Sequence, residues 1–173
     1  MFLYNLNEVI YVKILAIDQS STSSGIAIAE WLDWEDDWKL INHRTYKPKG
    51  KDFDERMLDL CRYVDELIMS YGIDIVVIED VYNLKNVSTL KKLANLQGAL
   101  KQVCAFTNTH YEVVTPAQWH KMLGCKNQRS LLKESSKNFV KDKFGLDNLS
   151  EDEYESICIL TYYLERGGRN ENS

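Results

Sequence analysis

The chain has 173 residues, of which 45% are hydrophobic and 27% charged, a composition typical of a soluble globular domain large enough to bury a core. No apolar run approaches the roughly 20 residues that span a bilayer. Residues 1–11 lack the basic start of a signal peptide, so we expect a cytoplasmic protein without a membrane segment. The net charge of −5, taken alone, argues against nucleic-acid binding.

The first part of the chain predicts three consecutive strands. Residues 12–18 are β-branched and apolar and stop at a Ser/Thr-rich turn, which is typical of a buried strand. Residues 25–29 predict a second strand, and residues 40–46 the strand that returns from an acidic, aromatic turn. Three sequential antiparallel strands form a meander. We expect the tryptophans of the turn to pack across this hairpin. They are Trp31, Trp34 and Trp38.

A helix and a central strand follow the meander. Apolar residues recur at helical spacing through residues 53–71, and Gly72 is placed to end that helix. Residues 73–79 are apolar at nearly every position, as expected for a strand that is covered on both faces. A helix that leads into such a strand implies a parallel crossover connection.

The second half of the chain predicts mainly helices. Helical patterns cover residues 87–106 and 130–144, and a short strand is predicted at residues 111–114. Thr115 and Pro116 are typical of a helix start, as N-cap and first helical residue. Ser150 and Glu153 match a capping box that opens a last helix through Leu164.

The cysteines do not form a zinc-binding pattern. The four are dispersed without a Cys-x-x-Cys pair, and the chain has only three histidines. Cys61, Cys104 and Cys158 fall within apolar helical patterns, so we expect them to be buried reduced thiols.

Four acidic residues are placed where a metal site would need them. Asp18 ends the first predicted strand and Glu79 ends the central one, while Asp152 and Glu155 share one face of the last helix because they are three residues apart. A carboxylate at the end of a buried strand is costly unless its charge is compensated, and a hard divalent cation is the simplest compensation. Each acid taken singly also fits an ordinary strand end or helix N-terminus. The set predicts one metal site.

The basic residues are unevenly distributed. Residues 82–145 contain 11 Lys and Arg but only three acidic residues, in a chain that is acidic elsewhere. Clustered cations are typical of phosphate binding, and the alternative is a solvated helix face. Beside an acidic metal site, phosphate binding is favoured. The cations are Lys85, Lys91, Lys92, Lys101, Lys121, Lys126, Arg129, Lys133, Lys137, Lys141 and Lys143.

Four motifs in this order resemble the RuvC family of Holliday-junction resolvases over roughly residues 13–165. They are the loop from Asp18 to Gly25, the acidic segment Ile78–Tyr82, the helix with Leu93 to Gly98, and the segment Asp152–Ile157. The resemblance implies an α/β, RNase H-like fold with a central mixed five-stranded sheet, three antiparallel strands then parallel strands, flanked by helices. It also implies one nuclease domain over residues 13–166, an N-terminal extension at 1–12 and a flexible tail at 167–173.

The resemblance also implies the chemistry of the site. Asp18 would bridge two Mg²⁺ ions, for which Mn²⁺ would substitute, with Glu79 and Asp152 as flanking ligands and Glu155 as a ligand or water-positioning group. Hydrolysis would nick the DNA backbone and leave a 5′-phosphate and a 3′-hydroxyl. The chain departs from the family where Gln19 and Ser20 replace Pro-Gly, and where Glu155 replaces an aspartate.

Further expectations concern DNA and oligomeric state. An aromatic at the position of Tyr82 would stack on bases near the junction centre. Because a four-way junction has near two-fold symmetry, a C2 homodimer is expected, and residues 86–106 are the candidate interface. If the chain is encoded by a phage, its location is the host cytoplasm. The residues expected to contact DNA are Tyr82, Lys85, Lys91, Lys92, Lys121, Lys126 and Arg129.

Three other functions also fit parts of the sequence. The loop from Asp18 to Gly25 resembles the first phosphate loop of actin-like ATPases and sugar kinases, but these need two such domains, so we expect no nucleotide cofactor. An RNA-processing nuclease with the same fold would use the same acids. A non-catalytic junction-binding protein would keep the fold, and the departures at Gln19 and Glu155 leave room for it.

Overall fold

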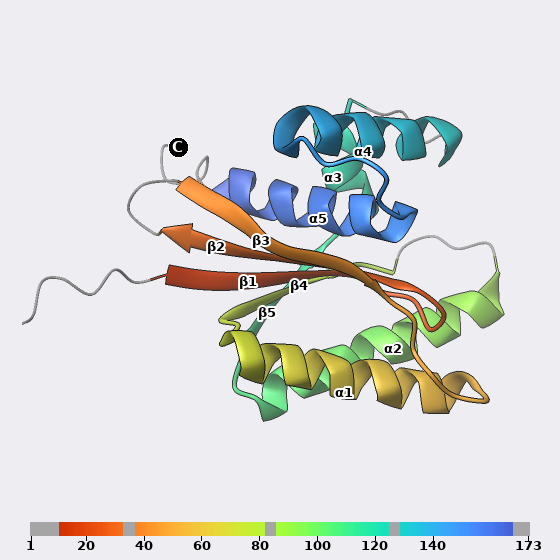
Figure 1. Ribbon diagram of the computed structural model, residues 1–173. Coiled ribbons are helices and arrows are strands. Elements are labelled where there is room, and N and C mark those ends of the chain that lie inside the picture. The colour runs from red at the N-terminus through yellow and green to blue at the C-terminus, as the bar shows by residue number, and fades with distance from the viewer. Residues whose placement is uncertain (1–10, 33–36, 82–85, 125–128, 168–173) are drawn as a thin grey trace, which may run out of the picture.

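The computed structural model describes residues 11–32, 37–81, 86–124 and 129–167. They form a five-stranded sheet in the order β3-β2-β1-β4-β5, with helices on both faces (Figure 1). β1, β2 and β3 pair antiparallel, whereas β4 pairs parallel with both β1 and β5. The predicted mixed sheet is confirmed. The strands are β1 (Tyr11–Asp18), β2 (Ser24–Leu32), β3 (Asp37–Tyr46), β4 (Ile75–Glu79) and β5 (His110–Val114).

The central strand is β1, which explains its unbroken apolar run. β2 and β4 hydrogen-bond to its two sides, and helices cover both of its faces. Successive side chains of a strand point to opposite faces. Leu15 and Ile17 therefore join the core on one face, and Ile14 and Ala16 join the core on the other, and all four are fully buried.

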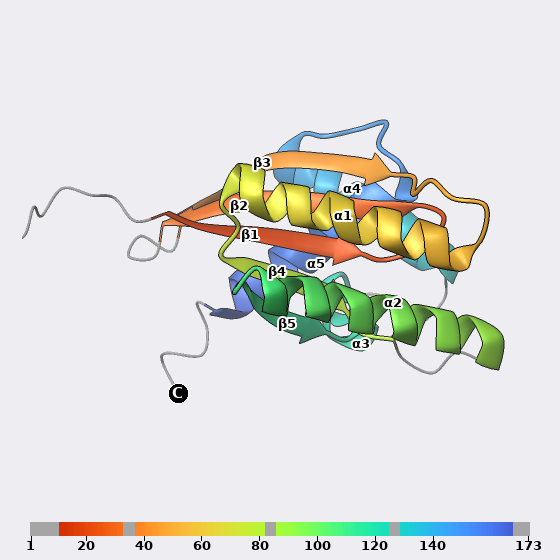
Figure 2. The same ribbon diagram turned by 90° about the horizontal axis from the view of Figure 1, so that it is seen from below.

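The helices form a layer on each face of the sheet. On one face, α1 (Phe53–Tyr71) and α2 (Val87–Phe106) lie side by side (Figure 1 and Figure 2). On the other face, α5 (Glu151–Gly167) lies on the sheet, and α3 (Pro116–Met122) and α4 (Arg129–Phe144) pack against α5 (Figure 1). The three layers are those of an α/β fold.

The predicted helix ends are confirmed. Gly72 ends α1 in the left-handed conformation, with φ at 64°. Thr115 is the N-cap of α3 and Pro116 its first residue. At the start of α5, the Glu153 N–H donates to Ser150 Oγ at 3.1 Å and the Ser150 N–H donates to Glu153 Oε2 at 3.2 Å, which is the predicted capping box.

The β2–β3 hairpin is longer than predicted, because pairing continues to Leu32 and Asp37. Trp31 is paired with Trp38 across it, as expected, whereas Trp34 lies outside the described residues. The Trp38 ring also packs on Phe144 at the end of α4, with 5.6 Å between the ring centroids. The hairpin therefore contacts the end of α4 through Trp38.

Two predictions from the sequence concern the residues that the helices contain. Cys61, Cys104 and Cys158 are buried thiols that form no disulfide bond with one another, as predicted. Among the described residues, no helix combines the length and the apolarity that crossing a membrane requires.

Candidate active site

Two of the four predicted acids meet at one edge of the sheet. β1 and β4 run parallel with Ile17 paired to Ile78, so Asp18 and Glu79 are the next residues on neighbouring strands. Val77, two residues before Glu79, faces the core beneath α5. By strand alternation, the Glu79 side chain also points to that face. The strand ends therefore direct a pair of carboxylates toward α5.

The first turn of α5 brings Asp152 to the same place. Gly25 of β2 is paired with Asp18, and a Cβ atom added at Gly25 would lie 1.8 Å from the carbonyl oxygen of Asp152. A glycine is therefore required for α5 to approach β2 this closely. The Ser23 hydroxyl donates to Asp152 Oδ2, which ties the helix to the loop that follows Asp18.

The four acids form one electrostatic cluster. Burial raises the pKa of Asp18 well above its ordinary value, and the charges of Glu79, Glu155 and Asp152 raise it further. Burial also raises the pKa of Glu79 to about 7, and the charges of Glu155 and Asp80 add to this effect. A neighbouring negative charge opposes ionisation of a carboxyl group. The structure thus gathers Asp18, Glu79, Asp152 and Glu155, which come from three distant parts of the chain.

The cluster does not form a closed ligand cage. Across the described residues, no three His, Cys, Asp or Glu side chains have the arrangement of a metal-binding group. Mutual repulsion favours separated carboxylates when no cation lies between them. To share an ion, these side chains would have to rotate toward one another.

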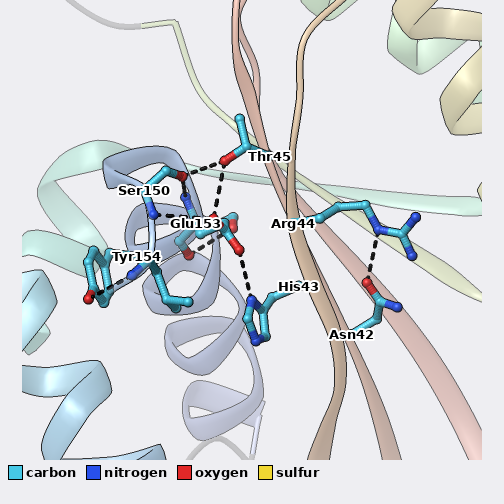
Figure 3. Close-up of polar contacts among 9 residues, drawn as sticks. Asn42, His43, Arg44, Thr45, Ser150, Glu153 and Tyr154 are labelled. Carbon is cyan, nitrogen blue, oxygen red and sulfur yellow. Dashed lines mark hydrogen bonds and ion pairs between the residues drawn. The ribbon is translucent and has the colours of Figure 1, made fainter. Parts of the chain in front are cut away.

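The two neighbouring acids of α5, Glu153 and Glu151, have other partners. Glu153 accepts a hydrogen bond from His43 Nδ1 at 2.9 Å and closes the capping box, on the side of α5 that faces β3 (Figure 3). Burial opposes ionisation of Glu153, but the hydrogen bonds from His43 and Ser150 hold its pKa below the ordinary value. Glu151 pairs with Lys133 at the surface.

Trp119 contacts the cluster, and no pattern in the sequence indicated this contact. Its indole Nε1–H donates to Glu79 Oε1 at 2.8 Å, and its side chain is 1% exposed. This hydrogen bond opposes the effect of burial and lowers the pKa of Glu79. The apolar pattern of α3 could have indicated that Trp119 is buried. It could not have indicated that β4 presents a carboxylate to the indole.

The loop after Asp18 is held by hydrogen bonds from its own side chains and from α1. The Ser24 hydroxyl donates to the Ser20 carbonyl at 2.7 Å and accepts from the Ser20 N–H at 2.9 Å. Arg56 of α1 donates from Nε to the carbonyl of Ser21 at 2.9 Å. The direction of the chain beyond Asp18 is therefore fixed by α1 as well as by β2.

Comparison with known proteins shows the family to which the chain belongs. The sequence profile of a family described as crossover junction endodeoxyribonuclease RuvC matches residues 14–141. The chain belongs to the RuvC family. The matched region contains Asp18 and Glu79, and the segment with Asp152 and Glu155 lies beyond it.

Individual RuvC proteins resemble the chain over most of its length. RuvC of Sulfurovum sp. is 30% identical over 157 residues, which are 90% of this chain and 96% of that protein. RuvC of Campylobacter lari is 30% identical over 135 residues, 78% of this chain and 83% of that protein. A solved structure of T. thermophilus RuvC in complex with a Holliday junction substrate has a TM-score of 0.69 at 15% identity, and covers 90% of this chain and 96% of that one. The last likeness shows the fold, which is the predicted RNase H-like arrangement.

The predicted DNA-contacting residues are only partly described by the structure. Lys91 and Lys92 are exposed in the first turns of α2, and Lys121 is exposed in α3. Tyr82, Lys85 and Lys126 lie outside the described residues, as does the side chain of Arg129, the first residue of α4.

The lysines of α4 form ion pairs with acids of the same chain. Lys133 pairs with Glu151, Lys143 with Glu165, and Lys141 with Asp147 at 2.9 Å. Lys137 also approaches Asp147, at 3.5 Å. A large part of the basic block is therefore neutralised within the fold, and the cations of α2 and α3 are the better candidates for phosphate contacts.

Replacing Asp18 with asparagine is expected to stabilise the metal-free protein at alkaline pH. The folded-state pKa values of Asp18 and Glu79 are raised, so stability is greatest below their unfolded values and is lost as pH rises through the folded ones, about 7 for Glu79. In EDTA, the free energy of unfolding of Asp18→Asn should exceed that of wild type at pH 8, because the variant places no negative charge among the other carboxylates. Urea unfolding at pH 8 and pH 5 measures the gain, which should shrink at pH 5.

A matched control for this measurement is Glu151→Gln. It removes a negative charge from the same turn of α5, but Glu151 is 57% exposed and pairs with Lys133 at the surface. Exposed ion pairs contribute about 0–1 kcal/mol, so this variant should differ little from wild type at either pH. An Asp18→Asn gain that is the same at both pH values, or that the control shares, would contradict the electrostatic explanation.

Trp119→Phe is expected to raise the pKa of Glu79 above about 7, because it removes the N–H that stabilises the ionised carboxylate. The ¹³C carboxyl shift of Glu79, followed through a pH titration in EDTA, measures this pKa. Trp38→Phe makes the same substitution at the hairpin, where the ring packs on Phe144, and should leave the pKa of Glu79 unchanged. An equal pKa in wild type and Trp119→Phe would show that the hydrogen bond does not act on the carboxylate.

Proposed function

We propose that the chain is a metal-dependent, structure-selective endonuclease that nicks phosphodiesters symmetrically in four-way and other branched DNA junctions. The observation that carries the proposal is the cluster of four carboxylates around the buried Asp18, in a chain of the RuvC family. Its relatives are named crossover junction endodeoxyribonucleases, and the T. thermophilus protein was solved with a Holliday junction substrate.

The cluster has the chemistry of a site for hard divalent cations. Burial raises the pKa values of Asp18 and Glu79, and the neighbouring carboxylates raise them further. Carboxylate oxygens are the ligands that Mg²⁺ takes in proteins, together with water and phosphate. We assign Mg²⁺ as the ion, with Mn²⁺ as a substitute, and two ions per site. Asp18 would bridge them, Glu79 and Asp152 would flank them, and Glu155 would bind an ion or position a water.

The chain's own residues prepare the site for phosphodiester hydrolysis. When bound, the ions supply an activated water and stabilise the charge on the leaving oxygen. Trp119 holds one oxygen of Glu79, so the other oxygen is left to face the cluster. Ser23 likewise holds one oxygen of Asp152. The nick would carry a 5′-phosphate and a 3′-hydroxyl.

DNA would reach the cluster across the cationic residues of α2 and α3. Lys91, Lys92 and Lys121 are exposed and would contact phosphates, which are recognised largely through their charge. We assign the same role to Lys85, Lys126 and Arg129. Tyr82 would stack on an unpaired base near the junction centre, a contact worth about 1–3 kcal/mol. The enzyme would act in the cytoplasm.

The enzyme would act as a C2 homodimer, because two symmetric nicks resolve a junction. We propose α2 as the interface. Val87 and Phe106, at its two ends, are 61% and 83% exposed. Between them, Ala94 and Gly98 are exposed, and a Cβ atom added at Gly98 would meet nothing within 4 Å. Small residues on an outward face allow two helices to approach closely.

The direct test is cleavage of an end-labelled four-way junction and a matched linear duplex, with Mg²⁺ and with EDTA. Wild type should give paired symmetric nicks in the junction when Mg²⁺ is present. Asp18→Asn should lose at least about 10²-fold in rate, because a ligand to both ions is lost. Glu151→Gln should cleave as wild type does.

The other outcomes of this test separate the alternatives. Junction binding without cleavage by wild type would support the non-catalytic binding protein. Cleavage of RNA but not of the junction would support the RNA-processing nuclease. Equal cleavage of junction and linear duplex would contradict structure selectivity.

The dimer is tested by light scattering at micromolar concentration. Wild type should have twice the mass of one chain, and Ala94→Arg should have the mass of one, because an arginine would separate the paired helices. Met69→Arg places the same side chain on α1, where Met69 is 73% exposed, and should remain dimeric. A monomeric wild type would contradict the dimer, and a dimeric Ala94→Arg would place the interface elsewhere.

A further inference from the structure

The main chain at the end of β4 is held from the face of the sheet opposite to the acid cluster. The carbonyl oxygen of Glu79 accepts a hydrogen bond from Gln19 Nε2 at 2.6 Å and another from Gln97 Nε2 at 3.1 Å. Gln97 belongs to α2, which covers the other face of the sheet from α5. Glu79 is thus held through its carboxylate by α3 and through its carbonyl by α2.

Every hydrogen-bonding group of the Gln97 side chain is used. Nε2 also donates to Asp80 Oδ1 at 3.2 Å, and Oε1 accepts from Lys101 Nζ at 3.2 Å. A carboxamide has two N–H donors on one atom and an acceptor on the other. Lys101 therefore fixes which end of the amide faces β4, and the two donors fix the positions of Glu79 and Asp80 relative to α2.

The Gln19 side chain is held by fewer hydrogen bonds than the Gln97 side chain. Its side chain is 8% exposed, and its Oε1 is buried without a hydrogen-bond partner among the described residues. A buried acceptor left unpaired costs roughly 1–3 kcal/mol. The single hydrogen bond of Gln19 to the Glu79 carbonyl must work against this cost, so Gln97 is the stronger of the two restraints.

We propose that Gln97, oriented by Lys101, is a positioning residue for the metal site. It fixes the main chain at Glu79 and Asp80, and thereby the reach of the Glu79 carboxylate into the acid cluster. The proposal rests on the metal-dependent function proposed above. It assigns Lys101 a role inside the fold, distinct from that of the exposed Lys91 and Lys92.

The test compares Mn²⁺ binding, measured by calorimetry without DNA, in wild type, Gln97→Met and Thr107→Val. Methionine keeps the length of the Gln97 side chain and removes its donors. Thr107→Val removes a side-chain hydrogen bond to a backbone carbonyl at the end of the same helix, 3.0 Å to Val103, away from Glu79. Gln97→Met should bind Mn²⁺ about 10-fold more weakly, the usual effect of losing a group that orients a ligand. Thr107→Val should bind as wild type does.

A second pair of variants separates positioning from folding. Lys101→Met removes the donor that orients the amide and should weaken Mn²⁺ binding, whereas Lys101→Arg keeps a donor and should restore it. Cleavage assays should show a lower kcat for Gln97→Met that higher Mg²⁺ recovers in part, with unchanged junction binding in EDTA. Equal Mn²⁺ affinity in wild type and Gln97→Met would overturn the proposal, as would equal loss in Gln97→Met and Thr107→Val.

These measurements distinguish the two proposals. If Mn²⁺ binding is weakened in Gln97→Met but wild type leaves junctions uncut, the proposed function fails and the positioning role stands. If wild type cuts junctions and Gln97→Met binds Mn²⁺ normally, the positioning role fails and the proposed function stands. If wild type binds no Mn²⁺, both are overturned.

Discussion

The arrangement of the site depends on the cost of burying Asp18 among other carboxylates. Asp18 is the last residue of the central strand, where it is partly buried between strands on both sides and helices on both faces. Burial alone would favour a neutral carboxyl group, and three neighbouring acids reinforce that preference. Four acids in this place lower the stability of the metal-free fold. A cation bound among them would offset the repulsion between their charges.

The surrounding fold holds this unfavourable cluster together. The missing side chain of Gly25 lets the first turn of α5 lie against β2 and brings Asp152 to the end of β1. Trp119 supplies a donor to Glu79 from one face of the sheet, and Gln97 supplies another from the opposite face. Apolar packing of both helical layers against the sheet provides the free energy that offsets the electrostatic repulsion.

The sequence predicted the elements and the gathering of the acids, because both follow from local patterns. The apolar runs of β1 and β4 indicated which strands are buried, and parallel pairing then places Asp18 beside Glu79. Spacing on a helix determined that Asp152 and Glu155 share a face, and the capping box explained Glu153. Each of these inferences needs only the period of one element and the order of the strands.

What the sequence did not predict depends on contacts between distant elements. Nothing near Trp119 shows that its indole meets a carboxylate 40 residues earlier, and nothing near Gln97 shows that its amide meets the end of β4. The ion pairs of the basic block were not predicted for the same reason. The lysines of α4 form a cluster in the sequence, but acids of α5 and of the loop before it neutralise several of them. Charge in a sequence indicates an available surface only where the fold leaves it unpaired.

The electrostatics of the cluster connect its stability with its proposed chemistry. A proton and a metal ion relieve the same repulsion, so they compete for Glu79, whose pKa of about 7 makes that competition strong near neutral pH. An ion that binds the folded state and not the unfolded chain stabilises the fold. Metal binding would therefore offset the free-energy cost of burying the acids. The hydrogen bond from Trp119 favours the ionised form of Glu79 and so favours the metal over the proton.

Gln97 acts on the same residue without changing its charge, by fixing the position of the main chain at Glu79. One residue at the end of β4 is thus tuned by α3 in its ionisation and by α2 in its position, and these two helices also carry the exposed lysines that would meet the DNA.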